Sequence, residues 1–229
     1  MSVAKAAVLA MVAAFAVSSR ELCAQTSTTP IPGRVEASVG VLWLGHQALG
    51  DAAANETTGA GGSMRIFTAS SDLAAAGGVD ARIAVRLLRS LEAAMEASYA
   101  KPKLNIALAN DIENAPPVTA AETTQQLMIG GSVVWYLPSR VSTARVAPFA
   151  TGGGGYLRQL HENGTLVDTG HYYQLGGGVK YLFFSHPGSR LAALGARVEA
   201  RAVLRAKGVA FDEKLHAAPA LGVSLFVRF

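Results

Sequence analysis

Four charged residues near the end of the chain all occupy odd-numbered positions. Arg197, Glu199, Arg201 and Arg205 are separated by small or apolar residues, and residues two apart in a β-strand face the same side of the sheet. Opposite charges on one face can line a path for ions, or they can neutralise one another as buried ion pairs. Either chemistry requires strands that keep this face away from bulk water.

Other residue types that often carry chemistry are poorly placed. The glycine runs at 152–155 and 176–178 lack the Lys-Ser or Lys-Thr of a phosphate-binding loop. The histidines have no metal-ligand spacing; they are His46, His161, His171, His186 and His216. We therefore expect no catalytic residue, no cofactor and no metal site.

Composition narrows the class of protein. The chain has 229 residues, of which 50% are hydrophobic and 16% charged, whereas soluble domains average about 25% charged residues. A disordered chain needs the opposite composition, and no stretch after residue 20 has the ~18 consecutive apolar residues of a membrane-spanning helix. The net charge of +4 is too small and dispersed for a nucleic-acid partner. A soluble β-protein and a membrane β-barrel remain.

The first residues have the layout of a secretory signal peptide. Lys5 precedes an apolar run over residues 6–17, and a polar stretch over residues 18–25 follows. The apolar run is too short to span a membrane as a helix. We therefore expect a signal peptide at 1–24 and a short N-terminal lead at 25–33.

The position of signal cleavage decides whether the mature protein has a thiol. Cleavage after Ala24 removes Cys23, the single cysteine of the sequence, and cleavage after Ser18 is the alternative. A lipoprotein signal would have Leu where this chain has Arg20, so a lipid anchor on Cys23 is not expected. With cleavage after Ala24, no thiol chemistry is available to the mature chain.

From residue 33 onward apolar residues recur with the period of two that is typical of β-strands. Eight segments follow this pattern, at 35–43, 79–87, 91–99, 127–136, 145–159, 173–183, 196–205 and 221–229. The segment at 145–159 is too glycine-rich for its faces to be assigned. In the other seven, one face has no charge and the opposite face holds Glu36, Asp80, Arg82, Arg86, Glu92, Glu96, Lys180, Arg197, Glu199, Arg201, Arg205 and Arg228.

The aromatic residues and the connections indicate that the apolar face meets lipid. Aromatic girdles at the two interfaces of a membrane barrel would consist of Trp43, Tyr99 and Tyr173 at one end and Trp135, Phe183 and Phe229 at the other. The connections alternate between long ones at 45–78, 110–124, 162–170 and 206–218 and shorter ones at 88–90, 138–143 and 184–195. Strands of about eleven residues at ~40° tilt cross roughly 28 Å, close to the ~25 Å apolar band of such barrels.

Three segments carry a resemblance to a known family: Pro148 to Tyr156, Gly176 to Tyr181, and the terminal Gly222 to Phe229. With the signal peptide and the strand pattern, they resemble the small outer-membrane β-barrel family similar to the OmpA transmembrane domain. The resemblance covers essentially the whole mature chain. One departure is that OmpA continues into a periplasmic peptidoglycan-binding domain, which we do not expect here.

The resemblance implies an all-β fold: an eight-stranded antiparallel up-and-down transmembrane β-barrel over residues 34–229, with long outer loops and short periplasmic turns. It implies a location in the bacterial outer membrane, with the N-terminus in the periplasm and outer-membrane lipid around the barrel. The C-terminal Phe229, with apolar residues at alternate positions before it, is similar to the signal that the barrel-assembly machinery recognises in this family.

An interior this narrow is just filled by its side chains. The charged face therefore predicts a salt-bridged plug, and a gated ion path is the alternative. A turn centred on Arg89 places Arg86 opposite Glu92 and Arg82 opposite Glu96, which predicts two cross-strand ion pairs. Glycines on the inward side of neighbouring strands are expected to leave room for the long arginines.

Lipid A-modifying enzymes are a competing class, because deacylases and palmitoyltransferases use barrels of this size. Deacylase resemblance would need a His-x-Ser pair with a nearby acid, and no histidine here has Ser two residues later. We therefore expect a non-enzymatic protein with a structural role in the cell envelope, and an enzyme is the less favoured alternative.

The outer connections offer further alternatives, namely adhesion, binding of an external ligand, or a weak pore for small solutes. The connection at 45–78 is long and rich in small residues, which predicts a mobile loop. Leu104, Ile106 and Leu108 continue the alternation past Lys101-Pro102 with flipped parity, which predicts a bulge and a strand projecting beyond the membrane. The sequence does not identify the external ligand.

Overall fold

The computed structural model describes residues 33–57, 61–109, 116, 118–137, 145–161, 166–186, 190–207 and 215–229. The predicted signal peptide, most of the N-terminal lead and the predicted turn at 138–143 lie outside these residues. Within them, no helix is long and apolar enough to cross a membrane.

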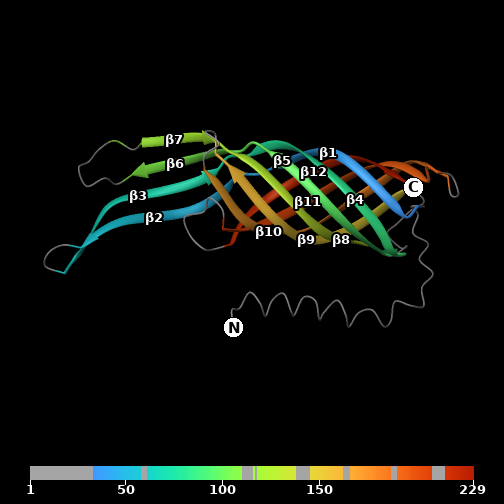
Figure 1. Cartoon of the computed structure of the whole chain (residues 1–229), viewed down its shortest axis with the longest axis horizontal. Helices are drawn as coiled ribbons and strands as arrows, with labels where there is room; N and C mark the ends of the chain where they lie inside the picture. Colours follow the sequence, from blue (N-terminus) through green and yellow to red (C-terminus); the bar gives the residue numbers. More distant parts are fainter. Residues whose placement is uncertain are drawn as a thin grey trace.

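Eight strands form a closed antiparallel barrel (Figure 1). Each strand pairs with the next barrel strand along the chain, and the first and last strands, β1 and β12, close the cylinder. The predicted all-β, eight-stranded, up-and-down barrel is confirmed. Its strands are β1 (Val35–Leu44), β4 (Ala76–Leu88), β5 (Leu91–Ala100), β8 (Gln125–Tyr136), β9 (Val146–Leu160), β10 (Val167–Ser185), β11 (Ala193–Lys207) and β12 (Leu215–Arg228).

Several strands are longer than the periodicity predicts. β10 begins at Val167 and β12 at Leu215, and β10 continues to Ser185. Residues within the expected connections at 162–170, 184–195 and 206–218 are therefore strand residues. Backbone pairing, which needs no hydrophobic alternation, extends the strands beyond the patterned segments.

The glycine-rich strand β9 has two distinct faces despite its composition. Phe149, Leu157 and Gln159 are buried in the interior, whereas Tyr156 and Arg158 are exposed on the outer surface. The faces of the segment at 145–159, which the sequence left open, are thereby assigned.

A second sheet extends from one end of the barrel (Figure 1). It has the order β2-β3-β6-β7, with β2 (Gln47–Thr57), β3 (Ser63–Leu73), β6 (Lys103–Ala109) and β7 (Val118–Thr123). The connection at 45–78, expected to be a mobile loop, contains regular structure, because β2 and β3 form a hairpin. The small residues of the hairpin do not prevent strand pairing. Leu49 of β2 and Leu73 of β3 pack against Leu104 of β6.

The projecting strand predicted near residues 104–108 is confirmed as β6. It begins after a two-residue break at Lys101 and Pro102 instead of a bulge. We call the end of the barrel that bears the second sheet the hairpin end. The end that holds Val35 and Phe229 is the terminal end.

The outer surface of the barrel is apolar. Val39, Met95 and Val198 expose 65%, 71% and 56% of their surface, which in water would be an unusually large apolar surface. Among the predicted girdle residues, Trp43, Tyr173, Phe183 and Phe229 are exposed, and Tyr99 and Trp135 are partly buried. The structure adds exposed Tyr156 at the hairpin end and exposed Tyr181 and Phe184 at the terminal end.

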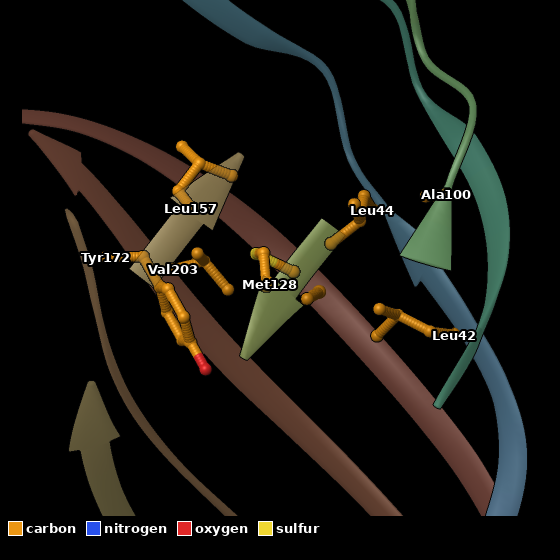
Figure 2. Packing of buried hydrophobic residues seen from close by; sticks show 8 residues of the cluster. Leu42, Leu44, Ala100, Met128, Leu157, Tyr172 and Val203 are labelled. Carbon is orange, nitrogen blue, oxygen red and sulfur yellow. The ribbon is translucent and has the colours of Figure 1, made fainter. Parts of the chain in front are cut away.

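The interior holds two layers of buried apolar side chains. The mouth apolar layer lies towards the hairpin end, where its side chains converge from several strands (Figure 2); it consists of Leu42, Leu44, Ala100, Met128, Leu157, Tyr172, Val203 and Ala220. The terminal apolar layer consists of Val134, Tyr136, Ala147, Phe149, Leu182, Ala193 and Phe226. Burying these groups stabilises the barrel by about 25 cal/mol per Å² of apolar surface.

Candidate functional site: the charged barrel interior

The charged residues that the sequence assigns to one face lie on inward positions of their strands. Eight of them are buried, namely Glu36, Arg82, Glu92, Lys180, Arg197, Glu199, Arg205 and Arg228. The side chains of Glu96 and Arg201 are also almost inaccessible, and Asp80 and Arg86 are intermediate. The structure divides most of these residues between two clusters.

The terminal charge cluster consists of Glu36, Glu92, Lys180 and Arg228, contributed by β1, β5, β10 and β12. Lys180 Nζ donates to both carboxylate oxygens of Glu36 at 2.7 Å and to Glu92 Oε2 at 3.2 Å. Arg228 Nε donates to Glu36 Oε2 at 2.8 Å, and Arg228 Nη2 also donates to Glu92. Each base contacts both acids, so two positive charges balance two negative charges.

Tyr136 completes the terminal charge cluster. Its hydroxyl donates to Glu92 Oε2 at 2.7 Å and accepts from Arg228 Nη2 at 2.9 Å. The Lys180 ammonium lies 5.3 Å from the ring centres of Tyr136 and Phe226, within the range of cation–π attraction. The sequence pattern did not assign Tyr136 to the interior cluster. Tyr136 is, however, an even number of positions from the other inward residues of β8, so the alternation could have identified it.

The central charge cluster consists of Arg82, Glu96, Arg197, Glu199 and Arg201. Arg197 donates to Glu199, and Arg201 Nε lies 3.3 Å from Glu199 Oε1. Arg201 Nη1 lies 3.6 Å from Glu96 Oε2. The Arg197 guanidinium also lies 4.3 Å from the ring centre of Phe149.

Polar residues from other strands complete this cluster. Gln174 accepts from Arg201 Nη1 at 3.0 Å and donates to Glu96. The Tyr172 hydroxyl donates to Glu96 Oε1 at 3.4 Å. Because these partners are uncharged and lie on β10, the charge pattern did not identify them.

The two predicted cross-strand pairs have different outcomes. Arg86 is opposite Glu92 and Arg82 is opposite Glu96 in the β4–β5 register, as predicted. Arg86 Nε lies 3.9 Å from Glu92 Oε1. The prediction of an Arg82–Glu96 ion pair is wrong. Arg82 instead donates to Ser132 Oγ at 2.6 Å and lies 4.0 Å from Glu199. Across a closed barrel, residues of non-adjacent strands are near enough to replace the cross-strand partner.

Several glycines make room for large interior side chains. A Cβ on Gly176 would lie 3.0 Å from Arg201 Cγ, and one on Gly130 would lie 2.5 Å from the Tyr172 hydroxyl oxygen. Both residues also approach the backbone of a neighbouring strand closely. These contacts agree with the expected role of inward glycines beside long side chains.

His161 lies at the rim of the hairpin end, directly after β9. Its Nδ1 is 3.1 Å from Glu122 Oε2, and its Nε2 is 3.1 Å from Asp168 Oδ2. Burial of the ring lowers the pKa, but the hydrogen bonds and charges of the two carboxylates outweigh this effect and raise the pKa above its usual value. Through these two contacts, His161 joins Glu122 of the second sheet to Asp168 of β10.

This arrangement is suited to holding strands together. Within the two charge clusters, the carboxylates are bonded to arginine or lysine, which leaves none of them as an unengaged general base. In the part of the chain that the structure describes, no group of three or more His, Cys, Asp or Glu residues could hold a metal ion.

Comparisons with known proteins agree with the observed architecture. No protein-family model matches the chain, and a search of curated proteins gives no significant match. Among solved structures, Neisserial surface protein A is similar with a TM-score of 0.52 and 13% identity, over 85% of this chain and 97% of that chain.

Two further matches have lower TM-scores. OprG of Pseudomonas aeruginosa has a TM-score of 0.43 and 11% identity, over 87% of this chain and 98% of that chain. Ail of Yersinia pestis has a TM-score of 0.40 and 8% identity, over 87% of this chain and 100% of that chain. From the closed barrel and the similarity to Neisserial surface protein A, this chain has the fold of the small eight-stranded outer-membrane β-barrels.

Proposed function

We propose that this protein is a non-enzymatic, integral protein of the bacterial outer membrane with a structural role in the cell envelope. The observation that carries the proposal is the inversion of polarity: Val39, Met95 and Val198 are exposed outside, while Lys180 and Arg228 are buried inside. In a bilayer, the exposed apolar surface meets hydrocarbon at no cost. The terminal end, with Val35 and Phe229, then faces the periplasm.

The interior supports a closed plug. Both charge clusters are made of mutually bonded side chains from several strands, and the mouth apolar layer lies between the central cluster and the hairpin end. An ion crossing the barrel would have to separate buried ion pairs, each of which loses several kcal/mol when one partner is removed, about 3–5 kcal/mol in general.

Cell fractionation, cysteine labelling and single-channel recording test this proposal. We expect the protein in outer-membrane fractions, with heat-modifiable migration in detergent. A water-soluble reagent should not label Val198→Cys in membranes, whereas Glu56→Cys on the second sheet should react. Planar bilayers should show no steady conductance. A freely soluble mature protein would contradict the membrane location, and steady conductance that falls in Arg201→Ala would contradict the plug.

The C-terminal residue supports a second part of the proposal, recognition by the barrel-assembly machinery. Phe229 is 55% exposed, and it is held at the β1–β12 seam by hydrogen bonds between its backbone and that of Arg34 and Val35. We expect Phe229→Ser to reduce the amount of folded protein in the outer membrane, with unchanged refolding of purified protein into detergent. Equal assembly of both variants would exclude this role.

The second sheet favours one alternative function, binding of an external partner. Its strands extend beyond the barrel and expose Met64, Phe67, Leu108 and Val118. Removing residues 50–70 should abolish binding to a surface or partner but leave the barrel folded. Pull-down with the intact and shortened proteins distinguishes this function from a purely structural one.

A further inference from the structure

A layer of buried polar residues lies directly above the mouth apolar layer. Gln126, Gln159 and Arg205 are each two positions nearer the hairpin end than Met128, Leu157 and Val203, respectively. They therefore point into the interior one layer further out. Gln126 and Gln159 are opposite each other in the β8–β9 register.

Gln47 belongs to the same layer. Its Nε2 donates to the backbone oxygen of His216 at 2.7 Å, and His216 is opposite Arg205 in the β11–β12 register. We call Gln47, Gln126, Gln159 and Arg205 the mouth polar layer. All four are at least 96% buried, with exposures of 1%, 1%, 2% and 4%.

Several polar atoms of this layer have no hydrogen-bond partner. They are Gln47 Oε1, both Nε2 and Oε1 of Gln126, and Arg205 Nε. A buried polar group without a partner costs about 1–3 kcal/mol, and more if it is charged. The layer therefore has hydrogen-bond donors and acceptors without partners at the same depth in the barrel.

Arg205 differs from the other interior bases. Lys180, Arg197, Arg201 and Arg228 each lie close to a carboxylate, as do Arg82 and Arg86. Arg205 has no carboxylate within 4.0 Å in the part of the chain that the structure describes. Water can satisfy the hydrogen bonds of a buried guanidinium, but only an anion compensates its charge.

The chemistry of the layer specifies the anion. Arginine presents a planar fork of donors that matches the oxygens of phosphate, and the Gln126 amide adds a donor. The unpartnered amide oxygens of Gln47 and Gln126 need donors in return. An anion with both acceptor oxygens and a hydroxyl satisfies both requirements.

We propose that the mouth polar layer binds a small oxyanion that carries a hydroxyl group, of which hydrogen phosphate is the simplest example. This goes beyond the proposed envelope function. Strand β11 extends only to Lys207, two residues past Arg205, so the layer is close to the hairpin end. The mouth apolar layer beneath it separates the anion from the central charge cluster.

Titration of the full mature protein, refolded in detergent, tests the proposal. Sodium phosphate, sodium sulfate and sodium chloride are added at pH 7 and matched ionic strength, and the thermal unfolding midpoint and calorimetric Kd are measured. We expect phosphate to raise the midpoint, as a ligand of the folded state does. Sulfate, which has no hydroxyl at this pH, should bind more weakly than phosphate.

Two variants and one matched control locate the site. Arg205→Met should weaken phosphate binding by roughly tenfold or more, as expected for loss of a charge-assisted contact. Gln126→Leu should reduce the preference for phosphate over sulfate, and it provides a second test if Arg205→Met folds poorly. Arg158→Met removes an exposed arginine from the outer surface of β9 and should leave binding unchanged.

Glycerol 3-phosphate distinguishes a free anion from a phosphate group on a larger molecule. Tighter binding of inorganic phosphate supports a site for the free ion, and tighter binding of the ester supports a site for an organic phosphate. An effect of phosphate no greater than that of chloride would overturn the proposal, as would equal binding by the original protein and Arg205→Met. Water alone would then occupy the layer.

Discussion

The two ends of the barrel interior treat buried charge in opposite ways. At the terminal end, Lys180 and Arg228 share Glu36 and Glu92, so every buried charge of the cluster has a partner of opposite sign. At the hairpin end, Arg205 is just as inaccessible but has no carboxylate partner in the described residues. The first arrangement is complete within the chain, whereas the second needs something from outside.

The difference indicates which part of the interior is structural. A balanced cluster drawn from four strands resists separation of those strands, because losing any member leaves an uncompensated charge. An unbalanced layer contributes less to stability and has unfilled binding capacity. The same barrel therefore combines a terminal end whose buried charges are paired within the chain with a hairpin end where Arg205 has no carboxylate partner among the described residues.

Removal of Lys180 should have the largest effect. Lys180→Met leaves Glu36 with Arg228 alone and Glu92 with Arg228 and the more distant Arg86. We expect a loss of about 3–5 kcal/mol in the free energy of unfolding. Urea unfolding in detergent measures the change. Lys103→Met, an exposed residue of β6, is the control, and a loss of similar size in both variants would contradict the special role of the cluster.

A double substitution sharpens this test. Glu92→Gln alone leaves two bases with one acid, but Lys180→Met combined with Glu92→Gln leaves Glu36 and Arg228 as a balanced pair. We expect the double variant to lose about 0.5–3 kcal/mol less than the sum of the two single variants. Strict additivity would show that charge balance does not stabilise the terminal end.

The corresponding change at the hairpin end should not destabilise the protein. Arg205→Met replaces an uncompensated buried cation by an apolar side chain of similar length, so without phosphate we expect a gain of about 1 kcal/mol or no change. Urea unfolding in phosphate-free buffer measures it. A loss comparable to that of Lys180→Met would mean that Arg205 has a partner within the protein.

The smallest expected effect is the pH dependence of the rim. The pKa of His161 is raised in the folded state above its usual value of 6.5, so its contribution to stability is fully present below that value. The contribution is lost as pH rises through the higher folded pKa. We expect the free energy of unfolding to fall by up to about 1 kcal/mol over this pH range. Urea unfolding of the original protein and of His161→Gln between pH 5 and 9 measures the change, which should be absent in the variant.

Sequence periodicity predicted the barrel because each strand contributes one lipid-facing and one interior face. It also predicted the register of Arg86 with Glu92, since a tight turn fixes the pairing of adjacent strands. It could not predict that Arg82 contacts Ser132, because that contact depends on how the closed barrel brings non-adjacent strands together.

Two further features were beyond the sequence pattern. The hairpin of β2 and β3 has many alanines and polar residues, so hydrophobic alternation gave no signal for it. Arg205 was assigned to the interior by parity, but its lack of a partner depends on the positions of the other interior side chains. Parity identifies which residues are enclosed, and only the three-dimensional arrangement identifies their neighbours.

The terminal charge cluster joins parts of the chain that are synthesised far apart. Glu36 bonds to Lys180 across 144 positions and to Arg228 across 192. Until β10 is in place, Glu36 has neither Lys180 nor Arg228 as a partner, and an unpaired carboxylate is costly in hydrocarbon. Insertion of one strand after another into a lipid bilayer is therefore unfavourable. The charged interior side chains must remain in contact with water until β1 and β12 pair.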